Sequence, residues 1–205
     1  MSKGILIVLS GPSGVGKGTV NKRVRELLPS LKKSISVTTR PKRPDEKDGV
    51  HYHFVTQEQF DALVKNDGLL EYAQVYNNFY GTPKKPVLEA LEKGEDMIFE
   101  LDIQGARLIK QAYNDCVRIF ISPPSIDELS NRLDQRGTET EEIKALRLAQ
   151  TKQELEEARF YDYFIVNNNI EEAAKKVVDI ISAEKAKTSR NKNKIDKLLK
   201  GESII

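Results

Sequence analysis

The chain has 205 residues, the ordinary size of one domain or of a core with small insertions. Charged residues form 31% of the sequence but nearly cancel, and a net charge of +2 does not mark a nucleic-acid-binding protein, so we expect no such partner. No apolar run reaches the length of a membrane span, about 18 residues, and the single cysteine, Cys116, excludes an intrachain disulfide. Because the first residues lead directly into an apolar segment, we expect no signal peptide and a cytoplasmic protein.

The first expected elements enclose a glycine-rich loop. The β-branched run Ile5–Leu9 is typical of a parallel strand buried on both faces, and the apolar spacing after Lys17 predicts a helix that ends at Pro29. The residues between them fit the pattern G-x-x-x-x-G-K, in which backbone N–H groups and a helix N-terminus bind phosphate and the lysine adds a positive charge. We therefore predict a phosphate site formed by Gly11, Pro12, Ser13, Gly14, Val15, Gly16, Lys17, Gly18 and Thr19.

One position of this loop changes the expected magnesium chemistry. Ser or Thr usually follows the lysine and binds Mg²⁺, but Gly18 stands here and Thr19 comes one position later. We therefore expect Mg²⁺ to be held mainly by nucleotide oxygens, water and another carboxylate. Asp102, which follows the apolar run Met97–Leu101, is placed for that role at a strand end. Glu100 lies two residues earlier and is expected on the same face of the strand.

The segment 35–82 reads as a small, mostly antiparallel insertion. Thr56 and Gln59 form a capping box that predicts a helix start. Arg40 and Arg43 lie in an extended, proline-containing stretch and predict, with Ser36, Tyr52, Tyr80 and Thr82, a second pocket for an anion. His51 and His53 are interpreted as strand surface because no third metal ligand accompanies them. The strands expected in this insertion are Ser34–Thr38, Val50–Val55, Leu69–Tyr72 and Asn78–Tyr80.

The remaining elements alternate between helices and strands. Thr82 is expected to cap a helix whose first residue is Pro83 and which stops at Gly94. Alternation of this kind predicts an α/β fold, a P-loop parallel sheet flanked by helices, with ligands at the carboxyl ends of the strands. The further expected elements are a strand Met97–Leu101, a helix Gln104–Tyr113, a strand Val117–Ile121, a helix after Ser125, a helix Glu141–Tyr161, a strand Phe164–Val166 and a helix Ala173–Ile181.

Two charged regions stand outside this core pattern. Arg132 and Arg136 share one helix face and Arg147 follows a polar, glycine-containing break, which predicts a helical, mobile lid that brings cations onto phosphates; ordinary surface ion pairs are the alternative. The lysine-rich tail 185–205 is expected to be a solvated, frayed extension, because no aromatic side chains accompany its charges as they would in a nucleic-acid contact. Its removal after Ala183 is expected to change stability little.

Six segments in a fixed order carry a resemblance to one family. They read SGPSGVGKGT, SVTTRPKRPDEKDGVHYHFV, LEYAQVYNNFYGTP, ELDIQGA, RLDQRGTETEE and VNN, and they resemble guanylate kinase from about Ile5 to Ile181. The resemblance implies a core of residues 1–34, 83–125 and 158–184, a GMP-binding domain of residues 35–82 and a lid of residues 126–157. It also implies transfer of the γ-phosphoryl group of ATP to GMP, with dGMP as a second acceptor and Mg²⁺ as cofactor. The tail lies outside the resemblance.

The resemblance also implies roles for individual residues. Asn167 corresponds to a contact with adenine, beside the ATP-binding loop. Glu71, Thr82 and Glu100 correspond to contacts with guanine. The contacts with the GMP phosphate correspond to Ser36, Arg40, Arg43, Tyr52 and Tyr80, and the catalytic cations to Lys17, Arg40, Arg132, Arg136 and Arg147.

Two alternatives are weighed against this function. The first is a kinase for another monophosphate such as AMP, against which Glu71 and Glu100 argue, because a carboxylate accepts the two donors of guanine but meets a lone pair on adenine. The second is a protein-binding module of the same fold without catalysis, against which the intact Lys17 and lid arginines argue. The sequence leaves open whether the protein is a monomer or a homo-oligomer.

Overall fold

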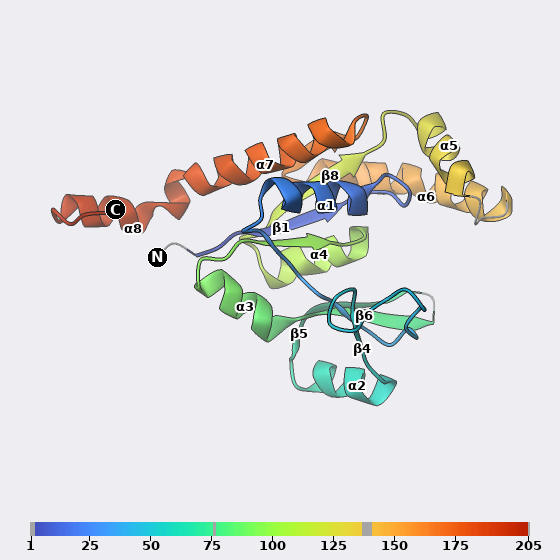
Figure 1. Ribbon diagram of the computed structural model, residues 1–205, viewed down its shortest axis with the longest axis horizontal. Coiled ribbons are helices and arrows are strands. Elements are labelled where there is room, and N and C mark those ends of the chain that lie inside the picture. The colour runs from blue at the N-terminus through green and yellow to red at the C-terminus, as the bar shows by residue number, and fades with distance from the viewer. Residues whose placement is uncertain (1–2, 76, 137–140, 205) are drawn as a thin grey trace.

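The computed structural model describes residues 3–75, 77–136 and 141–204, with side chains at all of these positions except 132–136 and 141–148. In this part of the chain the strands form two sheets (Figure 1). None of the described helices combines the length and the apolar character that crossing a bilayer requires.

The larger sheet is entirely parallel, which confirms the predicted α/β class. The register aligns Leu9 with Glu100 and Ser122 with Val166, so the carboxyl ends of these strands meet at one edge. In spatial order its strands are β2 (Lys32–Lys33), β7 (Met97–Glu100), β1 (Leu6–Ser10), β8 (Val117–Ser122) and β9 (Tyr163–Val166).

The central strand β1 is buried at every position because helices cover both faces of the sheet. Ile7 and Leu9 belong to one apolar cluster with α1 (Lys17–Leu27) and α7 (Ile170–Ala186). Leu6 and Val8 point to the other side and pack with α3 (Lys84–Glu92) and α4 (Ile103–Ala112). The uninterrupted apolar run in the sequence has this two-sided burial as its cause.

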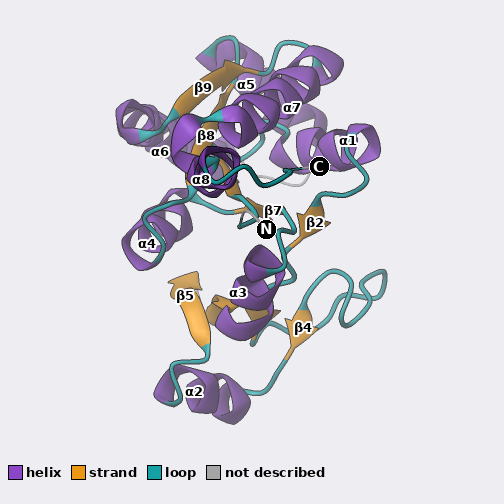
Figure 2. Cartoon of the chain, turned by 90° about the vertical axis from the view of Figure 1, so that its left-hand side faces the viewer, coloured by secondary structure: helices purple, strands orange, loops and turns teal. Residues whose placement is uncertain are grey.

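The smaller sheet and helix α2 (Gln57–Lys65) lie at the end of the molecule away from α7 (Figure 2). The predicted capping box is confirmed: the Thr56 hydroxyl accepts from the Gln59 N–H, and the Gln59 side chain accepts from the Thr56 N–H. Phe60 of α2 packs with Val37 and Leu69 in a separate small core. The strands, in spatial order, are β4 (His53–Phe54), β3 (Val37–Thr38), β6 (Asn78–Pro83) and β5 (Leu69–Val75), antiparallel except for β3 with β4.

Local signals misplaced several boundaries in this region. The strands predicted at Ser34–Thr38 and Val50–Val55 are each reduced to two residues, and Val50 is 56% exposed because the chain turns before β4. The predicted cap at Thr82 is wrong, since Thr82 belongs to β6 and helix α3 begins at Lys84. Sheet pairing with β5, the strand that precedes β6 in the chain, overrides the local cap signal.

Asp102 also differs from its expected position. Strand β7 ends at Glu100, so Asp102 does not share a strand face with it. Asp102 is instead the N-cap of α4, where its Oδ1 accepts the N–H of Gly105 at 2.7 Å. The physical reason is that the first N–H groups of a helix need acceptors, and a side-chain carboxylate supplies one.

The expected lid contains two described helices. These are α5 (Ile126–Arg136), whose start is marked by the Ser125 hydroxyl accepting from the Glu128 N–H, and α6 (Glu141–Glu157), which leads into η1 (Ala158–Phe160). The polar break between the helices lies outside the described residues. The side chains of Arg132, Arg136 and Arg147 lie outside them as well.

The tail corrects the expectation of a solvated extension. It forms η2 (Thr188–Arg190) and α8 (Lys192–Leu199), and its first residues are bound to the body of the protein. Lys185 Nζ donates to Asp96 at 2.6 Å, and Arg190 Nη1 donates to Asp115 at 2.8 Å. Charge composition alone did not predict this, because the carboxylates that accept lie far away in sequence.

Glu184 anchors the same junction. Its side chain is 3% exposed and accepts from Tyr163 Oη at 2.6 Å and from Lys187 Nζ at 2.5 Å. Beyond this point, α8 extends past the end of α7 with every residue exposed (Figure 1). Beyond Asn191, the described part of the tail, which is α8 together with residues 200–204, is therefore exposed throughout.

Two truncations will separate these parts. Ending the chain after Ala183 removes Glu184 and Lys185 and leaves the Tyr163 hydroxyl and the buried Asp96 without these partners. We expect the melting temperature to fall by about 5 °C or more, since roughly 2 kcal/mol corresponds to that shift in a protein of this size. Ending it after Asn191 removes only the exposed helix, and we expect a shift below about 2 °C. Thermal unfolding followed by circular dichroism measures both shifts. Equal shifts would contradict the stabilising role given to Glu184 and Lys185.

Candidate active site

The loop between β1 and α1 has the geometry of an anion site. Gly16, the N-cap of α1, has φ 92°, a left-handed conformation that glycine adopts without a steric penalty. Among the described residues, no side chain caps this helix start. The N–H groups of the first turn and the positive end of the helix therefore remain available for phosphate oxygens.

Lys17 lies over this loop. Its Nζ donates to the carbonyl oxygens of Gly11 at 2.6 Å and Pro12 at 3.0 Å. The ammonium group is thus placed at the loop by the backbone itself. Phosphate oxygens that enter the loop meet a cation that is already near its working position.

The glycine at position 18 is explained by a neighbour from β7. A Cβ built on Gly18 would lie 3.3 Å from Glu100 Oε1, closer than most real contacts. The carboxylate of Glu100 therefore lies against the first turn of α1. A larger residue at position 18 would push it away from the phosphate site.

A cavity of about 300 Å³ lies beside Glu100, between the two sheets. It unites residues that are far apart in sequence and that the sequence analysis named separately. Those lining residues are Ser36, Tyr52, Glu71, Tyr80, Glu100 and Asp102.

Glu71 is the most perturbed acid of this cavity. Burial raises its pKa to about 7, the charge of Asp102 adds to the rise, and the hydrogen bond from Thr82 opposes it. That bond joins Thr82 Oγ1 to Glu71 Oε1 at 2.6 Å. The carboxyl group of Glu71 and the hydroxyl group of Thr82 therefore lie directly beside each other.

Arg40 is held by an ion pair with Glu46, six residues later in the same proline-containing stretch. Its Nη2 lies 2.6 Å from Glu46 Oε1, and its guanidinium group lies over the Tyr52 ring at 5.6 Å from the centroid. The hydrogen bond from Arg40 and a second from the Arg43 N–H lower the pKa of Glu46 to about 2. Tyr52 in turn contacts Tyr80, with ring centroids 5.9 Å apart. The structure thus brings Arg40, Tyr52 and Tyr80 together, and Ser36 lines the same cavity as the two tyrosines.

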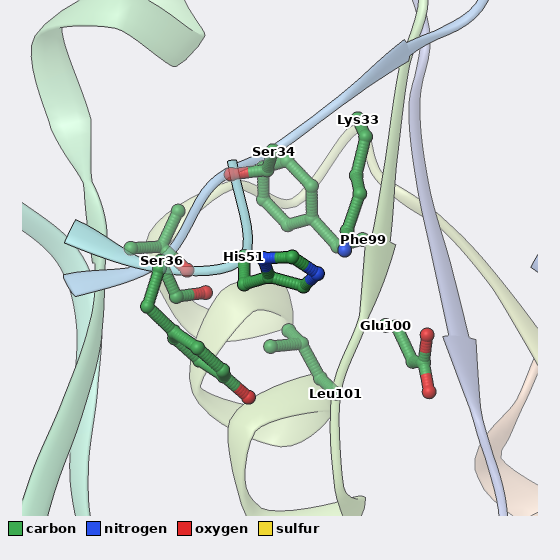
Figure 3. Close-up of a pocket in the computed structure, with 9 residues that line it drawn as sticks. Lys33, Ser34, Ser36, His51, Phe99, Glu100 and Leu101 are labelled. Atoms are coloured by element: carbon green, nitrogen blue, oxygen red, sulfur yellow. The ribbon is translucent and has the colours of Figure 1, made fainter. Parts of the chain in front are cut away.

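A second cavity, of about 140 Å³, adjoins the first and shares Ser36, Tyr52 and Glu100 with it. Its wall includes Lys33 and His51, which sequence reasoning did not place in a site (Figure 3). The interpretation of His51 as strand surface is corrected, because β4 starts only at His53. His51 Nδ1 instead accepts the N–H of Lys47 at 2.9 Å.

Helix α6 contributes one further acid that the sequence did not single out. Burial raises the pKa of Glu154, the charge of Lys17 opposes the rise and that of Asp102 adds to it. Glu154 is therefore electrostatically coupled to a lysine of the phosphate loop and to an acid of the cavity. The sequence offers no signal for it, because it is one of many glutamates in that helix.

Asn167 lies behind the loop, 2% exposed, and its Nδ2 donates to Val15 O at 2.8 Å. It borders a cavity of about 590 Å³ that Gly14, Gly16 and residues 168–171 also line. Within the described residues, no three His, Cys, Asp or Glu side chains gather closely enough to form a metal centre by themselves. A metal here would need ligands from the nucleotide.

Comparison with known proteins gives one family. The family model described as guanylate kinase matches residues 3–184. A guanylate kinase of Carboxydothermus hydrogenoformans is 50% identical over 190 residues, 93% of each chain. One of Clostridium tetani is 48% identical over 207 residues, 100% of this chain and 97% of its own, so its likeness includes the tail.

A solved structure agrees with the sequence comparisons. The crystal structure of guanylate kinase from Anaplasma phagocytophilum matches with a TM-score of 0.78 and 37% identity, over 96% of this chain and 95% of that one. With the phosphate loop and the acidic cavity meeting at Glu100, the fold, the site and the relatives agree, and the chain belongs to the guanylate kinase family.

Proposed function

We propose that this protein transfers the γ-phosphoryl group of ATP to GMP, and also to dGMP, giving ADP and the nucleoside diphosphate. The observation that carries the proposal is the meeting of two sites. A loop built to bind phosphates and a cavity with two carboxylates for a base open onto the same acid, Glu100.

The chemistry requires cations more than a base. The attacking oxygen belongs to a phosphate that is already ionised near pH 7, so no side chain has to remove a proton. Two highly charged anions must instead be brought into line. Lys17 serves the ATP phosphates, Arg40 and Arg43 with Ser36, Tyr52 and Tyr80 serve the GMP phosphate, and we propose that Arg132, Arg136 and Arg147 reach the reacting group when the lid closes and excludes water.

Recognition of guanine is assigned to the acidic side of the cavity. Guanine presents two donors, N1–H and the 2-amino group, and an ionised carboxylate only accepts. Glu71 and Asp102 line the same cavity, and Asp102 contributes to the raised pKa of Glu71, which supports a shared base site. Thr82 completes it with a hydroxyl group beside Glu71.

The geometry supports an exchange of two roles that the sequence analysis assigned. Glu100 lies against the first turn of α1, whereas Asp102 caps α4 and its charge adds to the raised pKa of Glu71. We therefore assign Glu100 to the Mg²⁺ side and Asp102 to guanine. Mg²⁺ is commonly bound by one or two carboxylates, substrate phosphates and water, which one glutamate here can satisfy. When bound, the ion neutralises charge that builds up on the phosphates.

The alternatives are less well supported. A binding module without catalysis has no need of a lysine held over a phosphate loop, and Lys17 is in that position. A kinase for AMP has no use for Glu71 facing the base. The cytoplasmic location, the absence of a nucleic-acid partner, the domain boundaries and the choice between monomer and homo-oligomer stay predictions.

The first test compares acceptors. With ATP and Mg²⁺, we expect kcat/KM for GMP to exceed that for AMP by about 10⁴-fold, because a site built for donors leaves its acceptors unpaired with adenine. Steady-state release of ADP measures both. Comparable use of AMP would contradict the proposed acceptor, and no turnover with GMP would contradict catalysis.

The second test is the pH dependence of GMP binding. The pKa of Glu71 in the free protein is about 7, above its ordinary 4.5, so the carboxyl carries a proton below pH 7 and must lose it to accept guanine. We expect KM for GMP to be roughly tenfold higher at pH 6 than at pH 8. Glu71→Gln should keep only the dependence that comes from the GMP phosphate, whose pKa is about 6. Identical pH profiles for the two proteins would remove Glu71 from the base site.

The third test separates the two exchanged acids. Glu100→Gln should lower kcat by about 100-fold and raise the Mg²⁺ concentration needed for half-maximal rate, with little change in KM for GMP. Asp102→Asn keeps a helix cap of similar strength and should mainly raise KM for GMP, by about tenfold. The kinetic constants of both variants are measured over a range of Mg²⁺ concentrations. The reverse pattern would restore the roles first expected from the sequence.

A further inference from the structure

Asn167 is held rigidly at the edge of the larger sheet. It directly follows β9, and its backbone N–H donates to Ser122 O at 2.8 Å, which continues the ladder between β8 and β9 by one residue. The side chain is 2% exposed. Its starting point is therefore fixed by the same ladder that fixes the strands.

The side chain of Asn167 reaches the phosphate loop. Its Nδ2 donates to Val15 O at 2.8 Å, between residues 152 positions apart in the chain. A Cβ built on Gly16 would lie only 2.8 Å from the same Nδ2. The amide thus packs directly against the peptide unit that joins Val15 to Gly16.

This contact sets the direction of one peptide unit. In a trans peptide the C=O and the N–H point in opposite directions, and none of the described peptide bonds is cis. With the Val15 carbonyl directed to Asn167, the Gly16 N–H points away from Asn167. It then has the orientation in which a P-loop presents its N–H groups to phosphate.

Such a fixed direction is not guaranteed by the loop alone. Gly16 has φ 92°, and glycine populates positive and negative φ about equally, so the peptide before it can rotate at little energetic expense. Rotation by half a turn would present a carbonyl oxygen in place of an N–H. An anion site would then contain an acceptor that repels phosphate.

We infer that Asn167 is a positioning residue of the phosphate loop, which holds the Val15 carbonyl outward so that the Gly16 N–H faces the phosphates of the nucleotide. It thereby acts on every nucleoside triphosphate alike, whichever base the nucleotide carries, and this role is separate from the contact with adenine that the resemblance implied. The inference rests on the proposed function, in which ATP is the donor.

The test compares two donors that differ only in the base. Inosine triphosphate carries a 6-oxo group and an N1–H where ATP carries a 6-amino group and an acceptor. With GMP as acceptor, Asn167→Ala should lower kcat/KM for both donors by about 100-fold, the scale of losing one preorganised donor. KM for GMP should stay within about twofold, because the base cavity is untouched.

Two further variants control for structure. Val177→Ala shortens a fully buried side chain of α7, in the apolar cluster that also contains Val15. It should lower the melting temperature and leave kcat/KM for either donor unchanged. Asn167→Asp, with a carboxylate facing the Val15 carbonyl, should lower kcat/KM for both donors at least as much as the alanine variant does. If Asn167→Ala does not fold, Asn167→Ser carries the same comparison of donors.

Three results would overturn the inference: wild-type kinetics in Asn167→Ala, a loss confined to ATP, or equal losses in Val177→Ala. Binding of ATP alone, measured by calorimetry, separates it from the proposed function. Weaker ATP binding in Asn167→Ala supports the positioning role even if the wild-type protein does not phosphorylate GMP. Equal ATP binding in both proteins contradicts the role even if GMP is the acceptor.

Discussion

The site depends on one constraint, the parallel register of the larger sheet. Leu9 lies beside Glu100 and Ser122 beside Val166, so four strands end at one edge and deliver their following residues to the same place. The phosphate loop follows β1, Glu100 ends β7 and Asp102 comes two residues later, and Asn167 follows β9. Shifting β7 by one residue would turn Glu100 to the opposite face of the sheet and away from Gly18. Burial of β1 on both faces makes such a shift unfavourable.

The site keeps its acidic and basic side chains apart. Acids occupy the inner cavity, where burial raises the pKa of Glu71 and Asp102 adds to that effect. The cations stay with local acceptors: Lys17 with backbone carbonyls, and Arg40 with Glu46. Ligand phosphates can replace these acceptors without long movements of the cations, since each already stands beside its pocket. A base with two donors relieves the repulsion among the acids at the same time.

Sequence patterns predicted the elements whose signals are local. The capping box at Thr56 and the strand before the phosphate loop needed no information from distant residues. Predictions failed where a partner outside the local pattern decided the outcome: Thr82 belongs to a strand because it pairs with Glu71 of β5. The tail is partly bound because Asp96 and Asp115 accept from it. No periodicity or composition carries that information, since these two ion pairs join residues 89 and 75 positions apart and the placement of Thr82 depends on a sheet partner.

The contacts of Asp96 and Asn167, which sequence patterns missed, share a physical character, because each involves a buried polar side chain. A buried polar group loses its water and is stable only where a partner meets it. Asp96 is 6% exposed and accepts both the N–H of Ile5, just before β1, and the ammonium group of Lys185. Its side chain is therefore stable only when the segments near both ends of the chain are bound in this arrangement. Asn167 is likewise a buried polar side chain with a fixed partner, since it donates to Val15 in the loop that follows the opposite end of β1. Apolar packing stabilises β1 as a whole without fixing the loops at its ends, since such packing has no direction. The hydrogen bonds of these buried polar pairs are directional and fix the segments at the two ends of β1. One of the pairs lies directly against the phosphate loop.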